Sequence, residues 1–253
     1  MNTSTNADPP VPFGGGPSLA AAGLWDSSGG KRIQLFTEQE RAQLAAISAV
    51  VRFRRGEKIY EEGDRADFVF NIISGVVKSY KILPDAGEFI IGFLFPDDVF
   101  GLAEEGSYIN SAEAVTAVTG YRIPTTVLKT RLLRDPSVEF HILCKLCHEL
   151  RESQRHSLLL STHRAVPKIA RFLLMLDTNQ AARGETTEEV YLPMTRSEIG
   201  NYTGMSPEAV SRSFRNLARQ EVISIRHQRY VRIINRLQLE RAASQSRTRG
   251  LLP

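Results

Sequence analysis

Residues 194–212 have the sequence MTRSEIGNYTGMSPEAVSR, which carries the signals of two short helices joined by a tight turn. Thr195 and Glu198 have the spacing of a capping box, in which the two side chains cap the first turn of a helix reciprocally. Gly204 tolerates the left-handed conformation that ends many helices. The Ser-Pro dipeptide at 206–207 is typical of a new helix, because serine caps it and proline needs no amide donor there. The segment is therefore predicted to be a helix-turn-helix unit.

The second helix of this unit is expected to have two chemically different faces. Val210, Phe214 and Leu217 recur at i, i+4 and i+7, so they are predicted to face a core. The opposite face carries polar and charged side chains at helical spacing, namely Glu208, Ser211, Arg212 and Arg215.

The chemistry of this outer face fits the edges of DNA bases. Arginine can donate two hydrogen bonds to guanine, glutamate can accept one from the cytosine amino group, and serine can contact a base or a thymine methyl group. Recognition helices present their N-terminal residues to the bases. A solvated polar face is the alternative for any amphipathic helix, but the cap, turn and Ser-Pro start together favour Glu208, Ser211 and Arg212 as base-reading residues.

Residues 221–234 are predicted to form a β-hairpin, with its turn at 226–229. A hairpin that follows a helix-turn-helix is a wing, and its arginines are suited to contact phosphate, which adds affinity without reading sequence. The residues predicted to contact phosphate are Ser206, Arg215, Arg226, Arg229 and Arg232.

Charge is unevenly distributed along the 253 residues. Residues 164–253 carry 15 Lys and Arg against 8 Asp and Glu, a net charge of +7, whereas the remainder carries 17 against 20. Because only the C-terminal part is basic, we expect that part to meet a polyanion, double-stranded DNA, although a merely solvated basic surface is the alternative.

The region from Val50 to Leu128 has a sequence pattern typical of β-strands and turns. Short β-branched or aromatic runs alternate with turn signals at roughly the 8–12-residue spacing of an all-β sandwich or barrel. The runs on either side of the Ser-Gly dipeptide at 74–75 are expected to be two strands of a hairpin, and the apolar run 89–95 to be a buried strand.

A long helix is predicted next, because no proline or glycine occurs from Ser137 to Val166. Leu143, Cys147 and Leu150 follow the 4-3 spacing of a seam suited to a partner helix. We expect this helix to pair with its twin in a two-fold homodimer, with burial against the chain's own β domain as the alternative. The predicted dimerisation residues are Leu143, Leu146, Cys147 and Leu150.

The N-terminal residues are rich in Gly, Pro and Ser, so residues 1–32 are predicted to be a disordered arm, followed by a short helix over 37–48. The start of the chain does not have the pattern of a secretory signal, and no apolar stretch is long enough for a membrane span. Two cysteines are too few for a disulfide framework. We therefore expect a cytoplasmic protein without membrane contact.

The order of these parts resembles the CRP/FNR family of bacterial transcription regulators. The likeness covers roughly residues 34–236, and the helix-turn-helix looks closest to the FNR/FixK branch, where Glu-x-x-Ser-Arg opens the recognition helix. It is carried by RGEKIYEEGD at 55–64, ISGVVK at 73–78, Gly101, MTRSEIGNY at 194–202 and EAVSR at 208–212.

The resemblance implies an α+β protein with an N-terminal β-roll (a jelly roll of the cyclic-nucleotide-binding type), a long dimerisation helix and a C-terminal winged helix-turn-helix. It also implies a homodimer on a TTGAT…ATCAA palindrome, contact with RNA polymerase, and control, often activation, of genes for low-oxygen or nitrogen metabolism. The expected parts are an arm over 1–32, a β-roll over 33–136, a dimerisation helix over 137–163, a winged helix over 164–236 and a tail over 237–253.

The sequence departs from the family where its sensors bind their ligands. Leu102 follows Gly101, and Asn110 stands where cyclic-AMP-binding members place the arginine that grips the phosphate. Oxygen-sensing members hold an iron–sulfur cluster with cysteines in the arm and the β-roll, and neither contains one here, so four thiolates cannot be assembled in one chain. We therefore predict no cofactor.

Other functions are weighed against this one. The CKLCH pattern at 144–148 matches covalent haem attachment, but it lies within a predicted helix, where helix packing is the simpler interpretation. A haem- or redox-sensing member of the same family, and a small-molecule-binding module whose winged helix serves protein contacts, are the alternatives. No phosphate-loop, zinc-protease or nucleophile-elbow motif occurs, so we predict no enzyme, no catalytic residue and no metal site.

Overall fold

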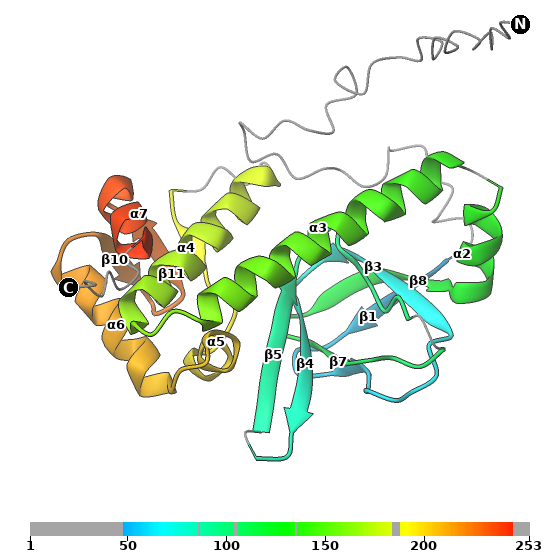
Figure 1. Ribbon diagram of the computed structural model, residues 1–253, viewed down its shortest axis with the longest axis horizontal. Helices are drawn as coiled ribbons and strands as arrows, with labels where there is room; N and C mark the ends of the chain where they lie inside the picture. The colour runs from blue at the N-terminus through cyan, green and yellow to red at the C-terminus, as the bar shows by residue number, and fades with distance from the viewer. Residues whose placement is uncertain (1–47, 86, 104–105, 135, 184–187, 245–253) are drawn as a thin grey trace, which may run out of the picture.

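The computed structural model describes residues 48–244, apart from residues 86, 104–105, 135 and 184–187 (Figure 1). The arm expected over 1–32 lies outside the described residues, as does the helix expected over 37–48 apart from its last residue, Ser48. A roll of β-strands comes first, a long helix crosses it, and a unit of helices with a small sheet completes the chain.

The roll consists of two four-stranded antiparallel sheets that face each other. The strand order is β1-β8-β3-β6 in one sheet and β2-β7-β4-β5 in the other. The strands are β1 (Ala49–Phe53), β2 (Lys58–Tyr60), β3 (Phe68–Ser74), β4 (Val77–Leu83), β5 (Gly87–Leu94), β6 (Val99–Phe100), β7 (Ser111–Ala114) and β8 (Val118–Pro124). The expected two-sheet β architecture is therefore confirmed.

The hairpin expected around residues 74–75 is wrong, because β3 and β4 belong to different sheets. β3 pairs with β8 and β6, whereas β4 pairs with β5 and β7. Gly75 has a φ of 95° at this crossing, and a Cβ there would lie 2.3 Å from the Ala117 carbonyl oxygen. Turn signals in the sequence indicate where the chain bends, but they do not indicate which strands pair with each other.

β5 is also less buried than its apolar sequence indicated. Ile90 and Phe93 are buried, whereas Ile91 is exposed between them. The strand thus has one covered face and one open face, which is usual for antiparallel sheets.

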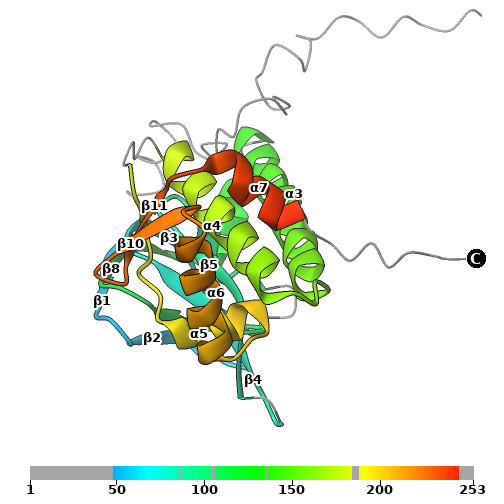
Figure 2. The same ribbon diagram turned by 90° about the vertical axis from the view of Figure 1, so that its left-hand side faces the viewer.

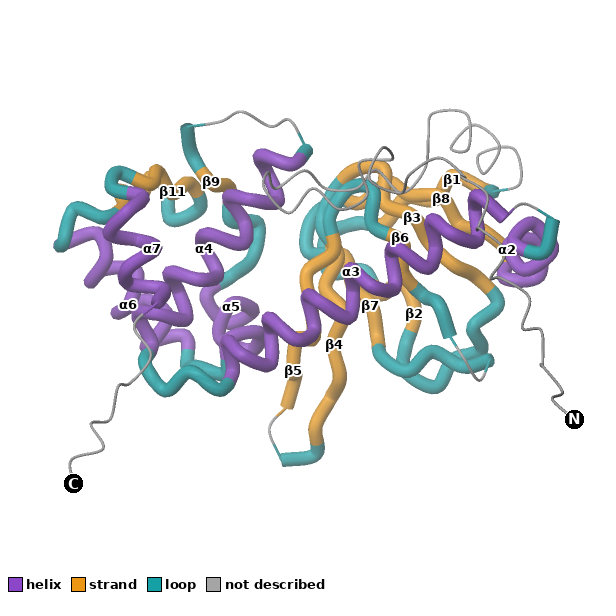
Figure 3. Tube along the Cα trace, turned by 45° about the horizontal axis from the view of Figure 1, so that its top comes forward, coloured by secondary structure: helices purple, strands orange, loops and turns teal. Residues whose placement is uncertain are grey.

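Helices connect the roll to the C-terminal unit. The helix α3 follows α2, a short helix that was not expected from the sequence. Figure 3 shows α3 running from α2 along the roll to the C-terminal unit. The remaining elements are α2 (Thr125–Leu132), α3 (Pro136–Leu160), α4 (Ala165–Ala182), β9 (Val190–Tyr191), α5 (Arg196–Thr203), α6 (Pro207–Arg219), β10 (Ile223–Arg226), β11 (Tyr230–Ile233) and α7 (Arg236–Ser244).

The segment expected to be a C-terminal tail begins with a packed helix. α7 buries Leu239 and Ala243, and α4 packs against both α7 and α6 (Figure 2). The missed signal is helical apolar spacing at Leu239, Ala242 and Ala243. This helix closes the side of α4 that the winged-helix elements leave uncovered.

One hydrophobic core joins the roll to the C-terminal unit. Phe93 of β5 lies 5.4 Å from Tyr202 of α5 and 6.3 Å from Phe172 of α4, measured between ring centroids. Val76 and Tyr80 of the roll belong to the same buried cluster. The winged-helix unit is therefore packed against the β4–β5 sheet and is not merely tethered to it.

Within the described residues, no helix combines the length and apolar character needed to cross a membrane. The same residues contain no group of three or more His, Cys, Asp or Glu side chains arranged to hold a metal ion.

Gly75→Ala is expected to destabilise the roll by about 2 kcal/mol or more, because the new Cβ would meet backbone and the positive φ strains an L-residue. Gly92→Ala is the matched control, since a Cβ on Gly92 meets nothing within 4 Å. Urea unfolding of both variants measures the difference. Equal stability of the two would contradict the close approach at Gly75.

Candidate nucleic-acid interface

The first helix of the helix-turn-helix, α5, begins with the predicted capping box. Thr195 Oγ1 accepts a hydrogen bond from the Glu198 amide at 3.1 Å, and Glu198 Oε2 accepts one from the Thr195 amide at 2.7 Å. Gly204 ends the helix with a φ of 64°, in the left-handed region. Ile199 and Tyr202 are buried.

Gly200 is a second required glycine in this unit, and the sequence analysis missed it. A Cβ at this position would lie 2.4 Å from the Met205 carbonyl oxygen, because the turn after α5 folds back against the helix. An isolated glycine within a helical pattern is the available signal, since such a residue often marks close packing. Gly200 lets α5 and α6 approach closely enough to form one rigid unit.

The recognition helix, α6, begins as predicted and buries the predicted face. Ser206 Oγ accepts a hydrogen bond from the Ala209 amide at 3.2 Å, and Pro207 is the first helical residue. Val210, Phe214 and Leu217 are fully buried. This anchoring fixes the rotation of α6 and so determines which side chains face outward.

The outer face of α6 presents the predicted base-reading residues. Glu208 and Arg212 are exposed, and Ser211 is half-buried. A backbone hydrogen bond, the Ser206 side chain and the charge of Arg212 hold the pKa of Glu208 below its ordinary value. Glu208 therefore remains an ionised acceptor at neutral pH. Arg215 is exposed one turn further along the same face.

The wing has the predicted form. β10 pairs with β11, and His227 and Gln228 form the turn with φ values of 49° and 59°. β9 adds a third strand through Tyr191 and Val190.

Two of the three predicted wing arginines have acidic partners. Arg226 Nη2 lies 2.6 Å from Glu189 Oε2 and its guanidinium stacks over Tyr230, while Arg232 pairs with Glu188. Hydrogen bonding to Arg226 lowers the pKa of Glu189. Arg229 is exposed at the end of the turn.

Arg196, which the sequence analysis did not single out, connects the wing to α6. Its guanidinium carbon lies 3.8 Å from the centroid of the Phe214 ring, and Nη2 donates to the Gln228 carbonyl oxygen at 3.3 Å. Burial lowers the pKa of this arginine. No local sequence signal identifies such a contact, because Arg196 and Gln228 are 32 residues apart.

The predicted dimerisation residues lie on an exposed face of α3. Leu143, Leu146 and Leu150 are 54%, 48% and 62% exposed, and Cys147 is exposed beside them. The alternative, burial of these leucines against the chain's own β domain, is not what the structure has. Cys144 is partly buried, and burial raises the pKa of its thiol, which disfavours the reactive thiolate.

Aromatic rings fill part of the interior of the roll. Tyr60 and Tyr108 stack with ring centroids 3.7 Å apart, and Phe70 and Phe100 pack beside them. Ser111 accepts a hydrogen bond from the Glu62 amide, and residues 101–112 contain no lysine or arginine.

Two family models match the chain. The model described as a Crp-like helix-turn-helix domain matches residues 167–242, and the one described as a cyclic nucleotide-binding domain matches residues 50–135. The fold and the exposed face of α6 thus define a winged-helix, DNA-binding transcription regulator.

Relatives support the same class. The nitrogen fixation regulation protein FixK of Bradyrhizobium diazoefficiens is 33% identical over 70% of this chain and 75% of its own length. The transcriptional activator protein Anr of Pseudomonas protegens is 33% identical over 68% of this chain and 71% of its own length. The structure of FixK2 from Bradyrhizobium japonicum superposes with a TM-score of 0.74 at 30% identity, and the match covers 79% of this chain and all of that one. The chain therefore belongs to the CRP/FNR family of transcription regulators, which are not enzymes, and is FixK-like within it.

His156 of α3 contacts the last turn of α5 in the helix-turn-helix. Its Nε2 donates to the Tyr202 carbonyl oxygen at 2.7 Å, and its ring stacks on the Tyr202 ring at 4.2 Å. Burial, with a smaller contribution from the charge of Lys168, lowers the pKa of His156 below its ordinary value of 6.5. Lys168 of α4 donates to the neighbouring Thr203 carbonyl oxygen at 2.7 Å. The last turn of α5 is thus held by hydrogen bonds from two helices.

Acidification is expected to destabilise the wild type more than His156→Gln. Because the folded pKa of His156 is lowered, the unfolded chain takes up the proton first, and stability is lost as pH falls through 6.5 towards the folded pKa. Thermal unfolding at pH 7.5 and 5.5 measures this, with His163→Gln as the control at an exposed histidine. An equal loss of Tm in wild type and His156→Gln would contradict it.

Proposed function

We propose that the chain acts in the cytoplasm as a homodimer that binds a TTGAT…ATCAA palindrome and activates genes of low-oxygen or nitrogen metabolism. The observation that carries the proposal is the outer face of α6, where Glu208 and Arg212 are exposed while the opposite face is fully buried. The names of the relatives, a nitrogen fixation regulator and a transcriptional activator, support the choice of genes and the direction of control.

Base reading is assigned to the first two turns of α6. Arg212 can donate two hydrogen bonds to guanine N7 and O6, and the ionised Glu208 can accept one from a cytosine or adenine amino group. Ser211, one residue before Arg212, is suited to contact a base or a thymine methyl group. Their placement near the N-terminus of α6 fits the way recognition helices enter the major groove.

Phosphate contact is assigned to residues around this reading face. Arg215 and Arg229 are exposed, and the Ser206 hydroxyl can donate to a phosphate while its oxygen caps α6. To contact phosphate, Arg226 would have to give up its ion pair with Glu189, and Arg232 its ion pair with Glu188. Such exchange costs little, because an exposed ion pair contributes about 0–1 kcal/mol.

Dimerisation is assigned to the exposed leucines of α3. A two-fold pairing through Leu143, Leu146, Cys147 and Leu150 would cover these side chains. It would also place two copies of α6 about 34–36 Å apart, one turn of DNA. RNA polymerase is the proposed further partner of the DNA-bound dimer.

The proposal is tested by titrating purified protein, without ligand and at fixed salt, against the TTGAT…ATCAA palindrome and a scrambled duplex. Selective binding is expected for wild type, and Arg212→Ala is expected to lose at least about fivefold in affinity, since one bidentate base contact contributes about 1–3 kcal/mol. Fluorescence anisotropy measures both.

Arg219→Ala is the matched control, because Arg219 is exposed in the last turn of α6, away from the reading residues. It is expected to keep its preference for the palindrome over the scrambled duplex. Full selectivity in Arg212→Ala would instead favour a winged helix that serves protein contacts.

Leu146→Ser combined with Leu150→Ser is expected to shift the protein from dimer to monomer without unfolding it, because both side chains are exposed in the single chain. Sedimentation velocity at micromolar concentration measures the state. Leu237→Ser, at a similarly exposed leucine of α7, is the control and should leave the dimer intact. A dimer that survives the double substitution would remove α3 from the proposed interface.

A further inference from the structure

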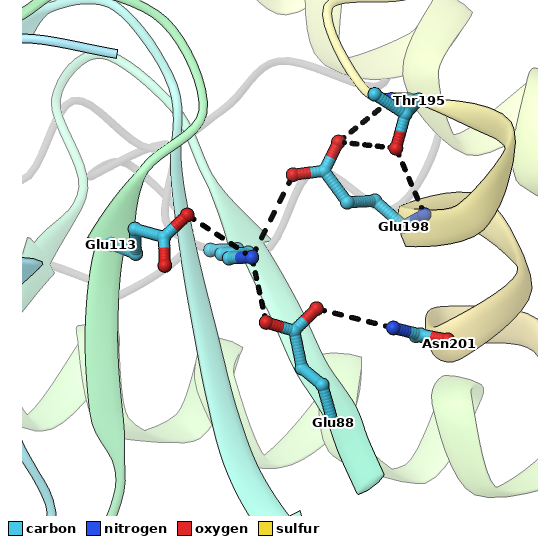
Figure 4. Close-up of polar contacts among 6 residues, drawn as sticks. Glu88, Glu113, Thr195, Glu198 and Asn201 are labelled. Atoms are coloured by element: carbon cyan, nitrogen blue, oxygen red, sulfur yellow. Dashed lines mark hydrogen bonds and ion pairs between the residues drawn. The ribbon is translucent and has the colours of Figure 1, made fainter. Parts of the chain in front are cut away.

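Lys78 is a buried cation on β4 whose partners come from both sides of the contact between the roll and the helix-turn-helix. Its Nζ lies 2.7 Å from Glu88 Oε2 on β5 and 3.2 Å from Glu113 Oε1 on β7. The third carboxylate, Glu198 Oε1 of α5, lies 3.7 Å away (Figure 4). Only 6% of the Lys78 side chain is exposed.

Glu198 serves two parts of the molecule at once. Its Oε2 atom accepts hydrogen bonds from the amide and hydroxyl of Thr195, while Oε1 faces the Lys78 ammonium. One turn later, Asn201 Nδ2 donates to Glu88 Oε1 at 3.1 Å. Figure 4 shows that α5 therefore meets the roll through two polar contacts on the same side of the helix.

The ammonium is what keeps the three carboxylates together. Burial acts to lower the pKa of Lys78, but hydrogen bonds and charges from Glu88 and Glu113 outweigh it, so the pKa is raised and the group stays charged. Without this cation, carboxylates from β5, β7 and α5 would repel one another in a poorly hydrated space. The N-terminal end of α5 favours an anion at Glu198, but its partial charge is smaller than that of a lysine.

The surrounding apolar contacts are less directional than this cluster. Phe93 and Tyr202 pack in tilted rings beside it, and burial of such side chains stabilises many similar arrangements almost equally. The hydrogen bond from Asn201 to Glu88 requires a defined distance and angle, and the Lys78–Glu198 ion pair at 3.7 Å adds attraction to the same helix. The apolar core therefore holds α5 against the roll, while the polar cluster selects one orientation of the helix.

The orientation of α5 determines that of α6. The turn at Gly204 is tight, Gly200 brings the two helices into close approach, and both helices share one core. In the arrangement held by Lys78, the side chains of Glu208 and Arg212 are exposed. A loss of this arrangement would change the direction in which both reading helices of a dimer point.

We propose that Lys78, acting through Glu198, is a positioning residue that sets the orientation of the recognition helix and hence the half-site spacing that the dimer accepts. The inference rests on the proposed palindrome-binding function. It assigns to a residue of the β-roll a specificity role that requires no contact with DNA.

The test compares Lys78→Met and Glu198→Gln with Glu113→Gln. Glutamine can still serve a capping box, so Glu198→Gln removes the charge that crosses the contact and keeps α5 capped. Glu113→Gln removes a carboxylate from the same lysine but leaves the contact with α5 unchanged, which makes it the matched control. Each protein is titrated against the palindrome, against palindromes with one base pair added or removed between half-sites, and against a single half-site.

Lys78→Met and Glu198→Gln are expected to lose about tenfold in affinity for the unaltered palindrome, within the range of coupled neighbouring groups, while their affinity for a single half-site stays unchanged. The differences in affinity between the three half-site spacings should become smaller in both variants. The double variant should lose no more than Lys78→Met alone, because the lysine acts through Glu198. Glu113→Gln should resemble wild type.

The proposal would be overturned if Glu198→Gln still distinguished the three half-site spacings as wild type does. It would also be overturned if Lys78→Met or Glu198→Gln bound the palindrome more tightly than wild type, or if Glu113→Gln lost as much affinity as these two variants. If Lys78→Met does not fold, Glu198→Gln decides the question alone. If wild-type protein shows no selectivity for the palindrome, the proposed function itself is wrong. The titration of wild type therefore separates failure of the proposed function from failure of the role assigned to Lys78.

Discussion

The packing of α5 against the β4–β5 sheet is the contact on which the rest of the arrangement depends. Tyr202 contacts Phe93 of the roll and Phe172 of α4 in tilted arrangements, and His156 stacks on its ring. The elements β5, α3, α4 and α5 therefore meet around one aromatic ring. Because this ring belongs to the helix-turn-helix, the reading surface is built on the same core that covers the β4–β5 side of the roll.

The local signals of the helix-turn-helix could be predicted because each depends on residues within one or two turns. The capping box, the left-handed Gly204 and the buried face of α6 are examples. Contacts that span the chain could not be predicted, since Asn201 and Glu88 are 113 residues apart and neither has a distinctive neighbour. The same limit explains why β3 and β4 were expected to pair, although they bend away into separate sheets.

The roll has the family's architecture. Stacked aromatic rings fill part of its interior, and the Ser111 hydroxyl accepts a hydrogen bond from the Glu62 amide. Where it meets the winged helix, the roll contributes a buried cation, Lys78. Lys78 thus links the roll to α5 at the contact between the two parts of the chain.

The exposed leucines of α3 have a consequence for the proposed dimer that depends on mass action. A monomer that leaves these side chains in water gains by association, so the dimer fraction rises with total protein concentration. Because a palindrome engages two recognition helices together, occupancy would respond more than linearly to the amount of protein near the dissociation constant of the dimer. The rate of synthesis and degradation of the chain could then act as a signal in itself, without a ligand in the roll.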